Sequence, residues 1–217
     1  MEMTLDNTGR PATAERSPGY WTTVGRRLLR NRLAIAAALI LLALILVALF
    51  APLLMPADPY ASSILKRLKP IGTEGYPLGT DEQGRDMLSR LILGARLSLF
   101  MGITPVLIAF VLGSALGIVA GYAGGWVNTA IMRVVDIFYA FPSVLLAIAL
   151  SGTLGAGVGN ALLSLTIVFV PQIARVAESV TTQVRNREFV DAARASGASA
   201  LTIVRAHVLN NVLGPIF

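Results

Sequence analysis

The side chains that most often carry catalysis are nearly absent from this sequence of 217 residues. It has no cysteine and one histidine, His207, so the usual Cys/His metal site cannot be assembled. Neither a His-Glu-x-x-His nor a Gly-x-Ser-x-Gly motif occurs. Its two lysines, Lys66 and Lys69, are not preceded by the glycine of a phosphate-binding loop. We therefore expect that the chain is not an enzyme and that it has no catalytic residue, metal or cofactor.

The residues with the most informative spacing lie between 189 and 199. Asp191 can pair with Arg187 four positions before it and with Arg194 three positions after it, as in a short helix. Gly197 suits the left-handed conformation that ends a helix, and Ser199 can cap the next one.

One face of this predicted helix carries Phe189, Ala192, Ala193 and Ser196, so it is narrow apart from the aromatic ring. Such a face could lie in a groove of another protein, with the phenyl ring as anchor. The alternative is an ordinary amphipathic connector that lies on the membrane.

A second polar pair, Arg133 and Asp136, interrupts an apolar region. The two residues are three positions apart and can pair on one helix face. They are either a polar contact inside a helical bundle or pathway, or an interfacial pair at the cytoplasmic mouth.

The residues named above must be positioned by the elements between them, and these are long stretches of the sequence without charged residues. Only 14% of the chain is charged, against about 25% in soluble domains. No Asp, Glu, Lys or Arg occurs in 33–57, 97–132 or 137–174. Because a membrane span needs about 20 apolar residues, we predict an all-α, polytopic membrane bundle. Its four spans are expected at 33–55, 97–120, 128–150 and 161–176, with a fifth beginning at the C-terminus.

The segments between the spans are assigned by charge. Residues 1–32 form a polar tail that ends in an arginine cluster, which predicts a cytoplasmic N-terminus. A signal peptide starts similarly, but its apolar part is only about 7–15 residues long. Residues 56–96 are expected to be periplasmic and to end in an amphipathic helix, and 177–206 to be a cytoplasmic loop. The core domain is then 97–217.

The second predicted span carries glycine at every fourth position: Gly113, Gly117 and Gly121. This spacing favours a ridge that lets another helix approach closely. The alternative is that glycine is simply common in membrane helices. The net charge of +6 is assigned to orientation signals beside the spans, with membrane lipid and not nucleic acid as the partner.

The segment 189–199 resembles the cytoplasmic loop motif of binding-protein-dependent ABC importer permeases. That motif reads Glu-Ala-Ala, three residues, Gly, nine residues, Ile-x-Leu-Pro. Asp191, Ala192, Ala193 and Gly197 match its first part with Asp for Glu, and Leu209 matches later, whereas Asn210 stands where the family has proline. Three further stretches are similar to the dipeptide, oligopeptide and nickel branch, C-type subunit: RRLLRNRLA, YPLGTDEQGRDMLSRLILGARLSL and GYAGGWVNTAIMRVVDIFYAFPSVLLAI.

The resemblance implies a type I ABC importer permease fold without a cofactor of its own. It implies that the loop around Asp191 is a coupling helix that docks on an ATPase subunit. The implied partners are a homologous permease subunit, two ATP-binding ATPase subunits and a periplasmic solute-binding protein, in a bacterial inner membrane.

The resemblance also implies two more spans after the loop, which leads us to expect a truncated gene product. A non-transporting anchor or defective fragment is therefore the alternative function, and a membrane-embedded enzyme is a third.

Overall fold

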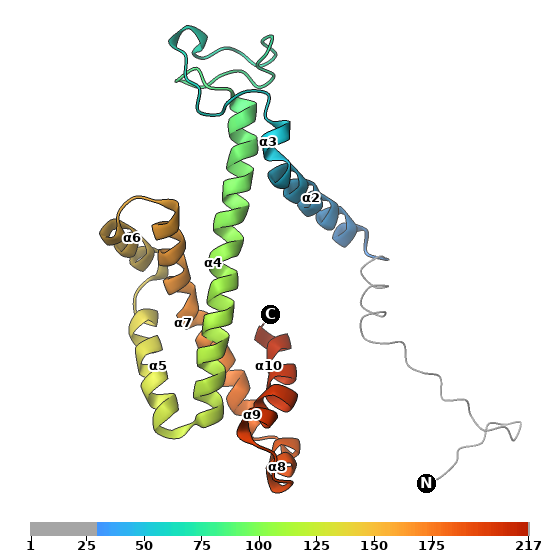
Figure 1. Cartoon of the computed structure of the whole chain (residues 1–217), viewed down its shortest axis with the longest axis vertical. Coiled ribbons are helices and arrows are strands. Elements are labelled where there is room, and N and C mark those ends of the chain that lie inside the picture. Colours follow the sequence, from blue (N-terminus) through green and yellow to red (C-terminus); the bar gives the residue numbers. More distant parts are fainter. Residues whose placement is uncertain (1–29, 217) are drawn as a thin grey trace, which may run out of the picture. The chain divides into compact units, whose positions relative to one another are not determined.

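The computed structural model describes residues 30–216, and no β-strand occurs among them (Figure 1). The prediction of an all-α chain with membrane-length helices is confirmed for these residues. Nearly all of the predicted N-terminal tail, 1–32, lies outside them. Contacts divide the chain into two units, 1–96 and 97–217, each of which is described by itself.

In the described part of the first unit, the first long helix is α2 (Arg32–Leu49), which is long and apolar enough to cross a membrane. The Oδ1 atom of Asn31 caps it, accepting hydrogen bonds from the amides of Leu33 at 3.0 Å and Ala34 at 3.3 Å. Its 18 residues correspond to about 27 Å of helix. After Phe50 comes the short helix α3 (Ala51–Leu54), so the region predicted as the first span consists of two helical pieces.

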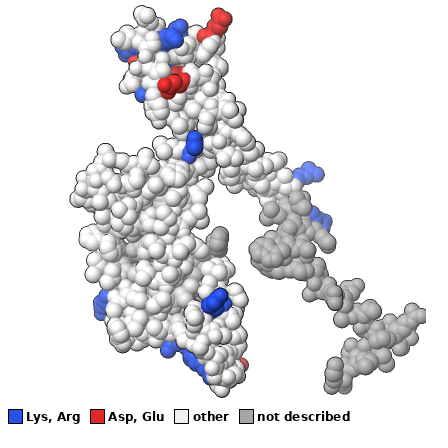
Figure 2. Space-filling view, viewed as in Figure 1, with Lys and Arg blue, Asp and Glu red and all other residues white. Residues whose placement is uncertain are grey.

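Between α3 and α4 the chain forms turns and one short 3-10 helix, η1 (Ile64–Lys66). Acidic and basic side chains gather over this segment (Figure 2). The buried hydroxyl of Thr80 accepts a hydrogen bond from the amide of Lys69 at 2.9 Å and donates one to the carbonyl of Lys66. These bonds fix a segment that has little regular secondary structure of its own.

A second polar network surrounds Asp81. Its carboxylate accepts hydrogen bonds from the amides of Gln83 at 2.8 Å and Arg85 at 2.9 Å, and from Nε of Arg85 at 2.8 Å. Burial raises the pKa of Asp81, but the hydrogen bonds and charge of Arg85, with the Gln83 amide, outweigh burial and bring the pKa to about 2.

The next helix, α4 (Met87–Ala123), is a single helix of 37 residues. Asp86 caps it through Oδ2, which accepts from the amide of Ser89 at 2.8 Å. The amphipathic residues expected before the second span are helical and form the first turns of α4, so they continue into the span without a break. No helix breaker stands between the amphipathic turns and the span, and each added residue gains a hydrogen bond.

In the second unit, α5 (Gly125–Tyr139) and α6 (Ser143–Leu154) meet at an angle of 87°. A single span was expected at 128–150, and in the structure this stretch consists of two helices, α5 and α6. Pro142 has no N–H group to donate and disfavours helical geometry at Phe141, which explains the break. Among the described residues, three helices have the length and apolarity of a span, and α5 with α6 makes a fourth if they count as one.

The last long helix, α7 (Val158–Arg185), packs against α5, α6 and α10. It extends nine residues beyond the predicted fourth span and includes the start of the predicted cytoplasmic loop. The remaining elements are α8 (Glu188–Ala195), α9 (Ala200–Ile203), the π-helix η2 (Val204–Val208) and α10 (Leu209–Ile216).

Candidate functional site

The segment with the informative spacing forms α8, and its ends follow from the sequence. Gly197 has a φ of +80°, a left-handed conformation that other residues adopt only with strain. The hydroxyl of Ser199 accepts a hydrogen bond from the amide of Thr202 at 3.2 Å and caps α9. The chain therefore stops and restarts within a few residues, which isolates α8 as a short, separate helix.

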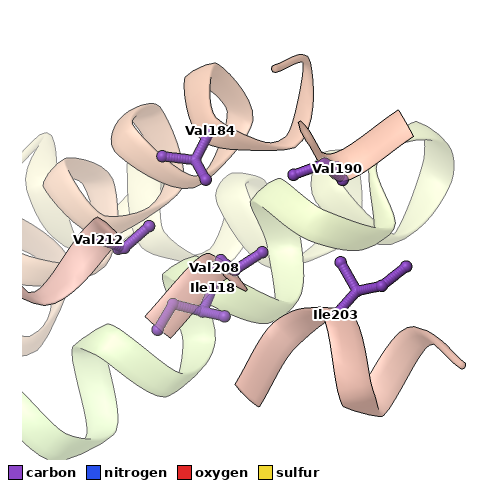
Figure 3. Packing of buried hydrophobic residues seen from close by; sticks show 6 residues of the cluster. All are labelled: Ile118, Val184, Val190, Ile203, Val208 and Val212. Carbon is purple, nitrogen blue, oxygen red and sulfur yellow. The ribbon is translucent and has the colours of Figure 1, made fainter. Parts of the chain in front are cut away.

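Helix α8 is held by a cluster of buried aliphatic side chains that converge from several elements (Figure 3). Val190 of α8 is fully buried in it, and Ile203 of α9 is 1% exposed. The cluster consists of Ile118 from α4, Val184 from α7, Val190, Ile203, Val208 and Val212. Burying one such side chain contributes about 1.5–3 kcal/mol. The cluster therefore fixes α8 to the ends of α4 and α7.

The cluster also decides which side of α8 is free. Asp191 and Ala192 are exposed, and Phe189 is 41% exposed, whereas Ala193 packs partly against the cluster. The predicted common face of Phe189, Ala192 and Ala193 is thus divided between an outer and an inner side. Sequence reasoning missed Val190, although its spacing of three from Ala193 could have indicated the inner side.

The outer side of α8 carries weak polar and aromatic contacts. Arg194 lies 3.3 Å from Asp191 and places its guanidinium 5.8 Å from the ring centroid of Tyr122. Phe189 lies 6.1 Å from His207, centroid to centroid, at the edge of a cavity of about 260 Å³ between α7, α8 and α10. This side therefore offers an aromatic ring, a carboxylate and small side chains to a partner.

The three regularly spaced glycines of α4 lie directly against α7. A Cβ atom on Gly113 would come within 2.8 Å of the Val170 carbonyl, and one on Gly121 within 2.7 Å of the Glu178 carbonyl. Gly117 is at least as close to α7. The residue numbers of the contacted α7 residues increase as the glycine residue numbers increase, so the two helices run parallel. The ridge lets the backbones meet and ties α4 to the helix that leads to α8.

Polar contacts reinforce the same end of these helices. Oε1 of Glu178 accepts hydrogen bonds from Nδ2 of Asn128 at 2.6 Å and from the hydroxyl of Thr182 at 3.2 Å. Arg185 donates to the carbonyl of Gly121 at 3.5 Å. The amide–carboxylate contact joins α5 to α7. Sequence reasoning did not single out these residues, since Glu178 fell in what was read as a loop.

The expected pair of Arg133 and Asp136 does not form among the described residues. Asp136 instead pairs with Arg175 of α7, whose guanidinium also lies 5.2 Å from the ring centroid of Tyr139. Residues 39 apart in sequence meet here because α5 and α7 pack together. Arg175 is thus a polar residue of this region that the local spacing could not indicate.

Two family models match the chain. Residues 113–217 match the binding-protein-dependent transport system inner membrane component, and residues 19–70 match the N-terminal transmembrane domain of oligopeptide transport permease C. The chain belongs to the binding-protein-dependent transport permeases. This family consists of transport components and not of enzymes.

Individual relatives agree with the family models. The permease is 41% identical over 196 residues to a dipeptide transport system permease protein of Alkalihalophilus pseudofirmus, covering 90% of this chain and 64% of the relative. It is 38% identical to a glutathione transport system permease protein of Pectobacterium atrosepticum, covering 87% of this chain and 63% of the relative. A dipeptide permease of Bacillus subtilis is 36% identical, with 92% and 62% covered. The permease chain thus spans somewhat less than two thirds of these curated relatives.

The matched regions contain the structural features described above. The first family match begins at Gly113 and includes the glycine ridge, the α5–α6 break and α8, and the second includes α2 and η1. The chain is therefore a membrane protein of this transport permease family, with several helices of membrane length among residues 30–216.

Proposed function

We propose that this chain is a membrane-spanning permease subunit of an ATP-driven, binding-protein-dependent importer of peptides or similar small solutes. The names of its relatives support peptides as the substrate class. The proposed location is a bacterial inner membrane with the N-terminus in the cytoplasm, because Arg30 stands just before α2 and Arg32 is its first residue.

The observation that carries the proposal is the attachment of α8. Val190 anchors the inner side of the helix in the buried cluster, while Asp191 and Ala192 stay exposed on the outer side. A short helix attached in this way moves as one body with the ends of α4 and α7. It can therefore pass a displacement from a docked ATPase to the membrane helices, and the reverse.

In this role the motif residues act differently. Phe189, Asp191 and Ala192 contact the ATPase, Ala193 keeps the inner side close to the cluster, and Gly197 ends the helix. ATP is bound and hydrolysed by the ATPase subunits and not by this chain.

The proposed assembly contains one homologous permease subunit, two ATPase subunits and a periplasmic solute-binding protein. The second permease completes a pathway that alternates in access between the two sides of the membrane. Membrane lipid surrounds the exposed apolar helix faces, such as that of α2.

The test is to place a charge on the exposed side of α8. Ala192→Asp adds a carboxylate beside Asp191 without entering the buried cluster, so we expect the complex to lose ATPase subunits on purification and to lose at least about 90% of solute uptake. Ala206→Asp makes the same change at an exposed alanine of η2, outside α8, and is expected to keep both. Normal ATPase association and uptake in Ala192→Asp would overturn the proposal.

A further inference from the structure

An ion pair lies within the charge-poor part of the second unit. Between residues 97 and 174 the sequence has two charged side chains, Arg133 and Asp136. Asp136 pairs with Arg175, and their side chains are 45% and 47% exposed. Exposed charges on membrane helices are costly against hydrocarbon, so they face a water-filled cavity or other protein. This face of α5 and α7 is therefore not a lipid-facing surface.

A cavity of about 210 Å³ opens where the chain breaks between α5 and α6. Tyr139 and Phe141 line it beside the break, Ser143 lines it at the first turn of α6, and Pro171 and Gln172 line it from α7. The break at Pro142 turns α6 through 87° and so leaves this space open. Its walls combine aromatic rings with a hydroxyl and an amide, as in sites that take small organic solutes.

The cavity and the ion pair adjoin one another through shared elements. Tyr139 lines the cavity and also lies under the guanidinium of Arg175 at 5.2 Å. Gln172 precedes Arg175 by three residues, so both lie on one face of α7. One region therefore offers a cation, a carboxylate, an amide and aromatic surface together.

We propose that this cavity, with the Asp136–Arg175 pair at its side, is a binding station on the solute pathway for the carboxylate end of a peptide. The proposal rests on the importer function above. Arg175 has five N–H donors, so it can bind the peptide carboxylate while it keeps its contact with Asp136, and neither charge is left unpaired. The cavity is smaller than the 300–1,000 Å³ usual for ligand sites, so it holds one terminal residue and not a whole peptide.

The competing explanation is that the second permease subunit covers this face and that the ion pair belongs to a protein interface. The two explanations differ in whether water reaches the cavity in the assembled transporter. They also differ in whether a small anion is attracted to Arg175.

Because the sequence has no cysteine, single cysteines can probe this directly in the assembled transporter in membrane vesicles. Gln172→Cys reports on the cavity, Leu41→Cys in α2 is the lipid control, and Glu74→Cys in the segment before α4 is the water control. Each is reacted with the anionic sulfonatoethyl and the cationic trimethylammonioethyl methanethiosulfonate. We expect Gln172→Cys to react with both reagents, Glu74→Cys to react likewise, and Leu41→Cys to react with neither.

The charge dependence then tests the role of Arg175. In Gln172→Cys, adding Arg175→Gln should lower the anionic-to-cationic rate ratio by about tenfold or more. Asp136→Asn should raise the ratio, and Arg175→Lys should leave it near the parent value. If the Arg175→Gln transporter does not assemble, the Arg175→Lys and Asp136→Asn variants still test the charge dependence.

The proposed binding site would be excluded if Gln172→Cys is unreactive, or if none of these variants changes the anionic-to-cationic rate ratio. In either case, the importer function would still stand if the parent transporter takes up solute normally and Ala192→Asp abolishes that uptake. Loss of charge dependence and loss of importer function are thus separate outcomes.

Discussion

At the scale of single residues, a few polar side chains of the protein each have several hydrogen-bond partners. Asp81 is the clearest case outside the membrane, because two amides and a guanidinium converge on its carboxylate. These bonds favour the ionised form, which explains why its pKa lies near 2 and not near 3.8.

The depressed pKa of Asp81 predicts a pH dependence. A lowered folded-state pKa stabilises the fold fully above 3.8, and this contribution is lost as the pH falls through about 2. We therefore expect the amides of Gln83 and Arg85 to keep their hydrogen-exchange protection, relative to intrinsic rates, from pH 7 to pH 4. Asp81→Asn should lose that protection at pH 7.

The matched control is Glu74→Gln, which removes an acid of the same segment that makes no hydrogen bond or ion pair among the described residues. It should leave the protection unchanged. Protection that stays unchanged in the natural chain from pH 4 down to about pH 2 would show that the pKa is not depressed, because equal pKa values in the folded and unfolded states give no pH dependence.

At the scale of helices, the contact of α4 with α7 depends on the absence of side chains. An added Cβ on Gly117 would meet the Ala174 carbonyl, the Ala177 Cβ and the Glu178 amide, all closer than normal contact. Two of these atoms belong to the backbone of α7 and cannot rotate away. The helices would have to separate, and the attachment of α8 to the ends of α4 and α7 would loosen.

We expect Gly117→Ala to destabilise the folded protein by about 1–3 kcal/mol, as overpacking does. Gly102→Ala is the matched control on the same helix, since nothing lies within 4 Å of its added Cβ. It should be neutral or stabilise by up to about 1 kcal/mol through helix propensity. Thermal unfolding of the two variants in the same detergent measures the difference, and equal midpoints would contradict the ridge.

The same helices show how far the sequence could be interpreted. Charge-free stretches predict spans because the bilayer excludes charge, and α2, α4 and α7 follow. The sharp break at Pro142 was less predictable, since proline can either bend or break a membrane helix depending on its neighbours. The Asp136–Arg175 pair and the burial of Val190 depend on tertiary packing, which local spacing does not contain.

At the scale of the whole molecule, the direction of α4 and α7 constrains the membrane topology. The glycine contacts make these helices parallel, so their C-terminal ends, Ala123 and Arg185, lie on one side. The chain between them must then return to the opposite side, which α5 and α6 can do together despite their break. Arg185 ends α7, and Arg187, Arg194 and Arg205 follow it, so the positive-inside rule predicts that this side is cytoplasmic.

This topology predicts which residues an impermeant maleimide reaches in intact cells. Glu74→Cys lies in the segment that leads into α4 and should be labelled from outside. Asn186→Cys lies between α7 and α8 and should be labelled only after the membrane is permeabilised. If α5 and α6 instead form a re-entrant loop, α7 starts on the inner side and Asn186→Cys is labelled in intact cells. That result would place α8 outside the cell, out of reach of any ATPase, and the importer mechanism would be excluded.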